Sequence, residues 1–487
     1  MAEFKLRLPD FWDFKKRHAR TVHVVGLDGI PWPCRVSKQE NLLIINRNRD
    51  ESGKVFVAYP FEKYGELTIA TGTLPESDKP YDLVTELARG TLNRLRNQTS
   101  IWQEGGLQIS DEVVSLTAAA VEKLSHSIMC DASDTASKDS SGAESLELAM
   151  DCVFELSRNF GGKISIFRAQ RKEFAKFWFA GSGVIPDQAV PNTFSCWEVQ
   201  PSPSPDDFKT TKLPMIYGPF LDASSGGTSG GYDLLEPEFE PRRRKLLSYC
   251  QSAVEAMEQV PDNNVSILHA VSGLNGTGHR NMSFPQQMQL ATDIFSALEK
   301  LKKNLPIMAS FDFPWAERLA SSVGGTHPLQ IADSLLRQGL QISYVGLEIN
   351  LDYWPAGSVT RDPLQWIDLI DVWSQLGLPL VLLVRIPQME TAKTPEQPAT
   401  VTTDDDTHRF ANIVRGNLND AQRCLMLDTV LPMMIARPNV HGVIWRQWQD
   451  ADDQRYPMGG LMDSSSNKKH IFDLIQALHS SILQQDS

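Results

Sequence analysis

Most of the chain repeats one pattern, in which a short apolar run is followed by a polar loop and then by an amphipathic segment. From about Glu173 onward, eight apolar runs of strand length can be identified. They are Lys176–Gly181, Thr193–Val199, Leu213–Pro219, Val265–Val271, Leu305–Asp312, Ile342–Ile349, Leu378–Ile386 and Val440–Trp445. The later runs are separated by FPQQMQLATDIFSALEKLKK, HPLQIADSLLRQG and PLQWIDLIDVWSQLG, whose apolar residues recur at helical spacing. Such alternation is typical of a parallel sheet covered by helices.

Eight strand–helix units over residues 173–487 predict the α/β class and a closed (β/α)₈ barrel of the TIM type. A doubly wound open sheet is the alternative, but no glycine-rich phosphate loop follows any of the strands. The loops after the third and seventh strands contain DASSGGTSGG and QMETAKTPEQPATVTTDDDTH. In a barrel such loops border the active face, where they are either lids or segments without a role.

The pattern before residue 173 is different. Residues 1–78 alternate apolar runs with turns and predict a small antiparallel β domain, in which NRDESGK is expected to be a hairpin turn. Residues 79–172 predict a helical segment, with Ser110 and Asp111 at the start of its second helix. CDASDTASKDSSGAE is expected to be a linker, with a long helix starting near Ser145. Trp32, Tyr59 and Tyr64 could stack on a sugar or could simply pack inside the β domain.

Composition narrows the functional classes. The chain of 487 residues has 47 basic and 60 acidic side chains, a net charge of −13, which argues against a nucleic-acid partner. The N-terminus lacks the apolar core of a signal peptide, and no run is long enough to span a membrane. The six cysteines are scattered without a CxxC motif, as expected for free thiols. We therefore expect a cytoplasmic protein without a membrane partner, and a homo-oligomer through the N-terminal β and helical region is an open option.

Three segments of the chain resemble the family-10 glycoside hydrolases, the xylanases. The ending HGVIWRQWQDADDQRYPMGGLMDSSSNKKHIFDLIQALHSSI is similar to that family's last strand with its tryptophan, sugar-site loop, Gly-Leu-X-Asp, lysine and closing helix. YVGLEINLDYW resembles its sixth strand and GLPLVLLVRIP its seventh. The resemblance covers residues 173–487. It implies a barrel that acts on, or binds, an oligosaccharide or polysaccharide of the β-1,4-xylan class at its C-terminal face.

The family's two catalytic glutamates are not found where the resemblance would place them. The nucleophile position of the seventh strand falls at about Val384, and the acid/base position of the fourth strand falls at Gly273, after Val271 and Ser272. Retaining glycosidases need two carboxyl groups about 5 Å apart across the bond that is cleaved. Valine and glycine cannot supply them, so an active enzyme would need carboxylates in a non-standard arrangement.

Several carboxylates do follow predicted strand ends. The candidate catalytic residues are Glu348, Asp312, Glu317 and Asp450, and Glu198 is a candidate for substrate binding. Two of them on one face could act as acid and base if their surroundings separate their pKa values. The alternative is that they cap helices or form ion pairs with Arg361, Arg385 and Arg446.

Aromatic and amide side chains near the same strand ends are candidates for substrate binding. They are Trp197, Asn275, Trp315, Asn350, Trp354, Trp445, Gln447 and Trp448. Indole rings stack on the apolar face of a sugar ring, and amides bind its hydroxyls. The alternative for each tryptophan is that it fills the core.

The sequence lacks the motifs that would indicate a metal site, a cofactor or an α/β-hydrolase. The ten histidines form no HExxH motif and His269 lies inside a strand, so we predict neither a metal nor a cofactor. No GxSxG elbow is present. Three hypotheses remain open: a glycoside hydrolase with relocated carboxylates, a catalytically inactive carbohydrate-binding barrel, and a scaffold or interaction protein built on a pseudo-glycosidase barrel.

Overall fold

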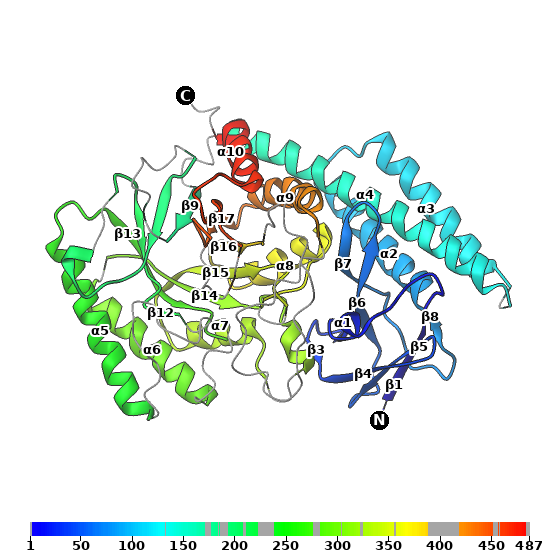
Figure 1. Ribbon diagram of the computed structural model, residues 1–487, viewed down its shortest axis with the longest axis horizontal. Helices are drawn as coiled ribbons and strands as arrows, with labels where there is room; N and C mark the ends of the chain where they lie inside the picture. Colours follow the sequence, from blue (N-terminus) through cyan, green and yellow to red (C-terminus); the bar gives the residue numbers. More distant parts are fainter. Residues whose placement is uncertain are drawn as a thin grey trace.

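The fold is known from a computed structural model. It describes residues 2–131, 133–170, 177–183, 185, 193–207, 211–222, 238–275, 283–302, 304–321, 325–354, 357–387, 418–450, 456 and 458–483. Two parts stand out in Figure 1, an α/β barrel and a smaller β region, with a layer of long helices running across both.

Eight parallel strands close the barrel. Its strands are β9 (Trp178–Ser182), β10 (Cys196–Val199), β11 (Met215–Tyr217), β13 (Val265–Ser272), β14 (Ile307–Asp312), β15 (Ile342–Asn350), β16 (Leu380–Arg385) and β17 (Val440–Trp445). Each pairs with the next along the chain, and β17 pairs with β9 to close the ring. A short strand, β12 (Leu221–Asp222), pairs beside the end of β13. All eight predicted strands overlap these elements, so the predicted barrel is confirmed.

The inside of the barrel is a separate apolar layer. It contains Ala180, Cys196, Ile216, Ile267, Met308, Val381, Leu383 and Ile444, which belong to strands around the ring. Side chains alternate between the inside and the outside of a strand, so Glu198, Ser310 and Glu348 continue this inner surface toward the C-terminal ends. At Gly346 an added Cβ would lie 2.5 Å from the Cβ of Ser310, so the crowded interior requires glycine there.

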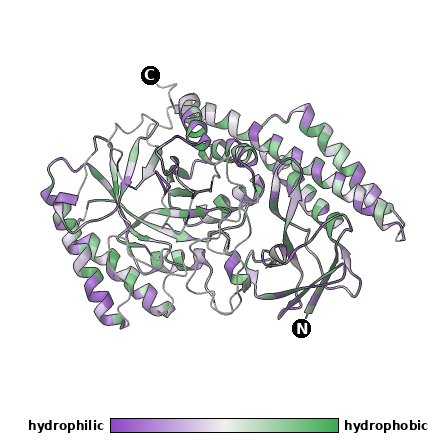
Figure 2. Cartoon of the chain, viewed as in Figure 1, coloured by the Kyte–Doolittle hydropathy of each residue, from purple (hydrophilic) through white to green (hydrophobic). Residues whose placement is uncertain are grey.

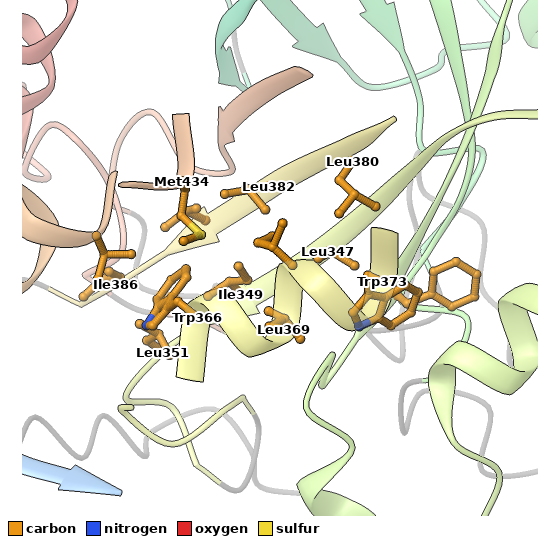
Figure 3. Close-up of a cluster of buried hydrophobic side chains, with 14 of the residues drawn as sticks. Leu347, Ile349, Leu351, Trp366, Leu369, Trp373, Leu380, Leu382, Ile386 and Met434 are labelled. Carbon is orange, nitrogen blue, oxygen red and sulfur yellow. The ribbon is translucent and has the colours of Figure 1, made fainter. Parts of the chain in front are cut away.

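Helices cover the outside of the barrel. They are α5 (Phe239–Gln259), α6 (Phe284–Leu301), α7 (Pro328–Arg337), α8 (Pro363–Ser374), α9 (Asp420–Ile435) and α10 (His470–Leu483). Figure 3 shows how the outward side chains of β15 and β16, such as Leu347 and Leu382, pack against Trp366 and Trp373 of α8 and Met434 of α9. Burial of these large side chains is the main source of stability for this layer.

The N-terminal β region consists of two four-stranded sheets. One has the order β4 (Cys34–Gln39), β5 (Leu42–Arg47), β1 (Ala2–Arg7) and β8 (Tyr81–Asp82), and the other β3 (Pro31–Trp32), β2 (His23–Gly26), β6 (Gly53–Phe61) and β7 (Gly65–Ala70). A short helix, α1 (Lys16–Ala19), lies between β1 and β2. The expected hairpin at NRDESGK is wrong, because β5 and β6 on its two sides belong to different sheets. Trp32, Tyr59 and Tyr64 are at most 3% exposed, so they pack inside this region.

Three helices follow the β region. They are α2 (Leu83–Glu104), α3 (Asp111–Met129) and α4 (Thr135–Gln170), and the Ser110 side chain caps α3 by accepting a hydrogen bond from the Val113 amide. The expected linker is wrong from Thr135 onward, because α4 begins there. A residue of the β region stabilises the polar first turns of α4. Asp139 accepts two hydrogen bonds from the guanidinium of Arg7 in β1, at 2.6 and 2.8 Å. Figure 2 shows purple, hydrophilic residues on this protruding end of the helical layer.

Polar contacts join the N-terminal part to the barrel. Arg94 of α2 donates to both carboxylate oxygens of Asp362, at 3.1 and 2.8 Å, while Asp362 caps α8. The Thr68 amide of β7 donates to the Thr360 carbonyl at 2.7 Å. A single hydrophobic core extends from Phe4 to Ile475. Domain boundaries at residues 78 and 172 therefore remain a prediction. None of the described helices is both long and apolar enough to cross a membrane.

The packing of α4 on the barrel can be tested at two adjacent glycines. A Cβ on Gly161 would lie 2.8 Å from the backbone nitrogen of Met433 in α9, whereas a Cβ on Gly162 would meet nothing within 4 Å. We expect Gly161→Ala to lower the free energy of unfolding by about 1–3 kcal/mol, because the two backbones must separate. Gly162→Ala is the matched control and should be neutral or stabilising by up to about 1 kcal/mol. Denaturant titration measures the free energy of unfolding of both variants, and equal stability of the two would contradict this packing.

Candidate active face of the barrel

A closed ring of buried polar side chains lies at the C-terminal ends of the strands. His269 of β13 bridges Glu198 of β10 and Ser310 of β14, with Nδ1 2.8 Å from Glu198 Oε1 and Nε2 2.9 Å from Ser310 Oγ. Ser310 donates to Glu348 of β15 at 2.5 Å. Ser272 also donates to Glu348, and Arg446 completes the ring by donating to Ser272 at 3.3 Å and to Glu198. Each member is at most 8% exposed, so the ring is part of the barrel interior.

Glu198 is the most strongly held carboxylate of the ring. Both of its oxygens accept from Nη1 of Arg446, at 2.9 and 3.0 Å, and Ser182 donates to Oε2 at 2.6 Å. Burial alone would raise the pKa of Glu198, but the charge of Arg446 and the bond from His269 outweigh it and lower this pKa to about 2. Glu198 is therefore a carboxylate at any physiological pH.

Glu348 is held on one side only. Its Oε1 accepts from Ser272 and Ser310, whereas no described residue donates a hydrogen bond to Oε2. Burial would raise the pKa of Glu348, but the Arg446 charge and the two hydroxyl donors outweigh it, so this pKa is lowered from its ordinary value. The sequence hypothesis gave Glu348 a catalytic role, and the structure leaves it with one acceptor oxygen to spare.

Asp312 and its neighbours form a second polar group beside the ring. Asn275 and Asp312 exchange two hydrogen bonds, since the Asp312 amide donates to Asn275 Oδ1 at 2.8 Å and Asn275 Nδ2 donates to the Asp312 carbonyl at 2.5 Å. Asn350 donates to the Asp312 carboxylate at 3.4 Å and accepts from Arg385 at 3.2 Å. The guanidinium of Arg385 also lies 4.5 Å from the centre of the Tyr456 ring. Three of the predicted residues, Asp312, Asn275 and Asn350, are thus brought together.

The position where the resemblance places a nucleophile faces away from the barrel interior. Val384 packs in the layer between the barrel and its helices, while its neighbour Leu383 belongs to the inner layer. Arg385, one residue further on, is the inward residue at the top of β16. Burial and the nearby Arg446 lower the pKa of Arg385. The inward position of the seventh strand is therefore occupied by a guanidinium and not by a carboxyl group.

The other two candidate carboxylates lie apart from the ring. Glu317 begins a short 3-10 turn after β14 and faces Arg361, 3.9 Å from its Nη2. Asp450 follows β17 and pairs with Lys469 at 2.5 Å, and it also accepts from the Gly460 amide at 2.8 Å. Burial raises the pKa of Asp450, partly offset by Lys469. Their predicted catalytic roles stay predictions.

The candidate tryptophans lie in or shortly after the barrel strands, and they are buried to different degrees. Trp197 and Trp445 are at most 1% exposed, and their indole nitrogens donate to the carbonyls of Gly183 and Gly459. Trp448 stacks edge-on against Trp197. Trp315 donates to the Gln365 carbonyl at the start of α8. Trp354, half-buried, packs edge-on against Phe313.

Gln447 is the remaining candidate for substrate binding. Its Nε2 donates to the Gln449 carbonyl at 3.2 Å, and no described residue donates to its Oε1. The side chain is 4% exposed and lies beside Gly459.

The sequence hypotheses missed the side chains that connect the ring. Ser182, Ser272, Ser310 and Arg446 were not among the candidate site residues, although Arg446 was named as an ion-pair partner for the carboxylates. A usable signal was present: Ser182, Ser272 and Ser310 lie at or near the C-terminal ends of largely apolar strands, and a buried hydroxyl needs a partner. Within the part of the chain that the structure describes, no cluster of three or more His, Cys, Asp or Glu side chains could hold a metal ion.

Among known proteins, the chain has only distant structural similarities in what the comparisons found. No protein-family model matches the chain, and neither does any curated protein. Among solved structures it is similar to xylanase 10B from Thermotoga maritima, with 8% identity and a TM-score of 0.40 over 65% of this chain and 99% of that one. It is also similar to an intracellular xylanase from Thermoanaerobacterium saccharolyticum, with 10% identity and a TM-score of 0.40 over 62% of this chain and 97% of that one.

A family-10 endoxylanase from a sugarcane soil metagenome gives similar values, with 10% identity and a TM-score of 0.40 over 63% of this chain and 99% of that one. The likeness to xylanases is therefore distant. The barrel itself is established by its own strand pairing.

The state of Glu198 predicts how stability depends on pH. Its pKa of about 2 in the folded protein lies below the ordinary value of 4.5, so its stabilising effect is complete above pH 4.5 and is lost as the pH falls toward 2. We expect Glu198→Gln to remove a pH-dependent contribution of about 3 kcal/mol. Denaturant titrations from pH 7 to pH 2 should show the wild type and the variant converging in acid. Glu112→Gln, at an exposed position of α3, is the control, and a constant gap between wild type and Glu198→Gln would contradict the prediction.

Proposed function

We propose that this protein binds an oligosaccharide at the C-terminal face of the barrel, with Glu348 as the central hydrogen-bond acceptor. The observation that carries the proposal is the one-sided environment of Glu348. It is a buried carboxylate with a lowered pKa, and no described residue donates to its Oε2. A buried anion with an unused acceptor costs free energy unless a donor from a ligand or from water completes it.

The side chains around Glu348 suit a ligand with many hydroxyl groups. A sugar hydroxyl can donate to a carboxylate and accept from a guanidinium or an amide at the same time. Arg385 and Asn350 stand beside Glu348 as such groups, and the Tyr456 ring lies against Arg385. Convergent polar groups beside an aromatic ring are the usual composition of a small-molecule site.

Xylo-oligosaccharides are the first ligands to test. The reason is the resemblance of the closing segment, from the last strand to the final helix, to the family-10 ending. The net charge of −13 is compatible with a neutral sugar.

Hydrolysis is the second candidate function, and a specific observation favours it. An ionised carboxylate with one unengaged oxygen is the state that a glycosidase nucleophile needs. The difficulty is the general acid, which needs a raised pKa. The pKa values of Glu198 and Glu348 are both lowered, so neither can donate a proton near neutral pH. Asp450 has a raised pKa, but Lys469 and the Gly460 amide already occupy its oxygens. Burial raises the pKa of Asp352 to about 6, but its carboxylate is turned to Arg423 of α9 and to Thr360. Binding without turnover is therefore the function that the geometry supports best.

Glu348→Gln tests the proposal. The substitution keeps the size of the side chain and an oxygen that can accept from Ser272 and Ser310, but it removes the charge. We expect xylohexaose to bind the wild type in isothermal titration calorimetry and to bind Glu348→Gln about tenfold or more weakly, because a charged acceptor is worth roughly 1.5–3 kcal/mol. Glu255→Gln, at an exposed position of α5, is the matched control and should bind like the wild type.

The outcomes separate the hypotheses. Release of reducing sugar by the wild type, abolished in Glu348→Gln, would replace binding by hydrolysis. Absence of binding to a panel of oligosaccharides, with an intact thermal transition, would favour the scaffold protein. Equal affinity of the wild type and Glu348→Gln would show that Glu348 is not the acceptor.

A further inference from the structure

A cavity lies between the N-terminal β region and the barrel, away from the polar ring. It has a volume of about 330 Å³. One wall comes from residues 19–23 and from Cys34 and Val36 of β4, and the other comes from the segments that follow β14 and β15, with Glu317, Ala320, Trp354 and Val359. Its size lies at the lower end of the range of about 300–1,000 Å³ for ligand pockets.

The barrel wall of the cavity contains a buried carboxylate that lacks hydrogen-bond donors. Glu317 is 1% exposed, and neither of its oxygens accepts a hydrogen bond from a described residue. The nearest cation is Arg361, whose Nη2 lies 3.9 Å away, beyond hydrogen-bond distance. Arg361 is fixed near the Phe56 and Trp315 rings, 5.6 and 5.2 Å from their centres. It balances the charge of Glu317 without satisfying its oxygens.

The opposite wall contributes a second acceptor. His23 Nδ1 lies 2.9 Å from the Thr21 carbonyl, which can only accept, so Nδ1 carries the proton. Burial, with a smaller effect from Arg361, lowers the pKa of His23 to about 3, so the ring is neutral. Its Nε2 therefore carries a lone pair. The ring is fixed in place by stacking on Phe56, with the two centres 4.8 Å apart.

The rest of the lining is mostly apolar. Val22, Val36, Val359 and Ala320 line the cavity, and the half-buried indole of Trp354 offers an aromatic surface. Arg20 is exposed at the rim. Acceptors on two opposite walls, with an apolar and aromatic remainder, suit a ligand that has an apolar body and hydrogen-bond donors.

From this arrangement we infer that the cavity is a second carbohydrate site, which takes one or two neutral sugar units. Their hydroxyls donate to Glu317 and His23, and the C–H face of a ring lies on Trp354. A cation is disfavoured because Arg361 already balances Glu317, and an anion is disfavoured by Glu317 itself. The inference does not depend on the proposed function, because the cavity shares no residue with the polar ring.

Cys34 allows binding in the cavity to be measured directly. It lines the cavity and is half-buried; the other half-buried cysteine is Cys130, so Cys130→Ser provides the background. The rate at which iodoacetamide alkylates Cys34 is followed by peptide mass spectrometry, with and without D-xylose, xylobiose or D-glucose. At a sugar concentration of twice the dissociation constant, occupancy should slow the alkylation about threefold.

Two cavity variants and one control from the polar ring decide the outcome. Ala320→Leu fills the cavity and Trp354→Ala removes the aromatic surface, so both should abolish the protection of Cys34. Glu348→Gln should leave it unchanged. Thermal melts show which variants fold, and one folded cavity variant is sufficient for the test.

The proposal is overturned if none of the three sugars protects Cys34, or if protection persists in a folded cavity variant. Protection that disappears in Glu348→Gln would also overturn it, because the sugar would then act from the barrel face. Calorimetric binding of xylohexaose that depends on Glu348, without any protection of Cys34, would keep the proposed function and reject the second site alone.

Discussion

The buried polar ring at the C-terminal ends of the barrel strands depends on the charge and hydrogen bonds of the Arg446 guanidinium. This cation follows β17 and is buried, and it donates to Glu198 of β10 and to Ser272 of β13. Burial alone would lower the pKa of Arg446, but the charges of Glu198, Glu348 and Asp222 outweigh it and raise this pKa. Without Arg446, Glu198 would be left buried without a compensating charge, a situation that typically costs about 3–5 kcal/mol. The ring thus links strands far apart in the sequence, and each of its members needs the others to remain in the interior.

The same ring limits the chemistry that the barrel can perform. A retaining glycosidase separates the pKa values of its two carboxyl groups, so that one is ionised and the other protonated. Here a single cation lowers the pKa of both Glu198 and Glu348. At the inward position of the seventh strand, Arg385 adds a second guanidinium. Such an interior favours hydrogen bonding to a neutral polar ligand over proton transfer to a leaving group.

The sequence predicted the barrel strands well because these strands are buried on both faces. A continuous apolar run such as Leu378–Ile386 has few other interpretations when helices follow it. Two other predictions failed because the deciding contacts are far away in the sequence. The start of α4 is rich in serine and aspartate, as loops are, and it is helical where Arg7 of β1 binds Asp139. The segment between β5 and β6 has turn composition, but strand pairing elsewhere places its two ends in different sheets.

For the candidate site, too, the sequence predicted the positions of residues along the strands but not the contacts between residues far apart in the chain. The structure places Glu198, Asp312 and Glu348 near the C-terminal ends of β10, β14 and β15, where the sequence pattern put them, and their roles stay predictions. The charge balance could not be read locally, since Glu198 and Arg446 are 248 residues apart. Ser272 and Ser310 are short polar residues in apolar strands, and only the closed barrel brings both within reach of Glu348.

The N-terminal part is bound to the segments that border the active face, which argues against a tethered accessory module. Asp352 follows β15 and lies 3.6 Å from Arg423 of α9, and burial raises the pKa of Asp352 to about 6. Trp354, two residues later, faces the cavity against the N-terminal β region. Glu348, Asn350, Asp352 and Trp354 lie along one segment that runs from the polar ring to the cavity. The segment after β15 also contacts the β region directly, since the Thr68 amide of β7 donates to the Thr360 carbonyl and Gln365 Nε2 donates to the Thr68 carbonyl.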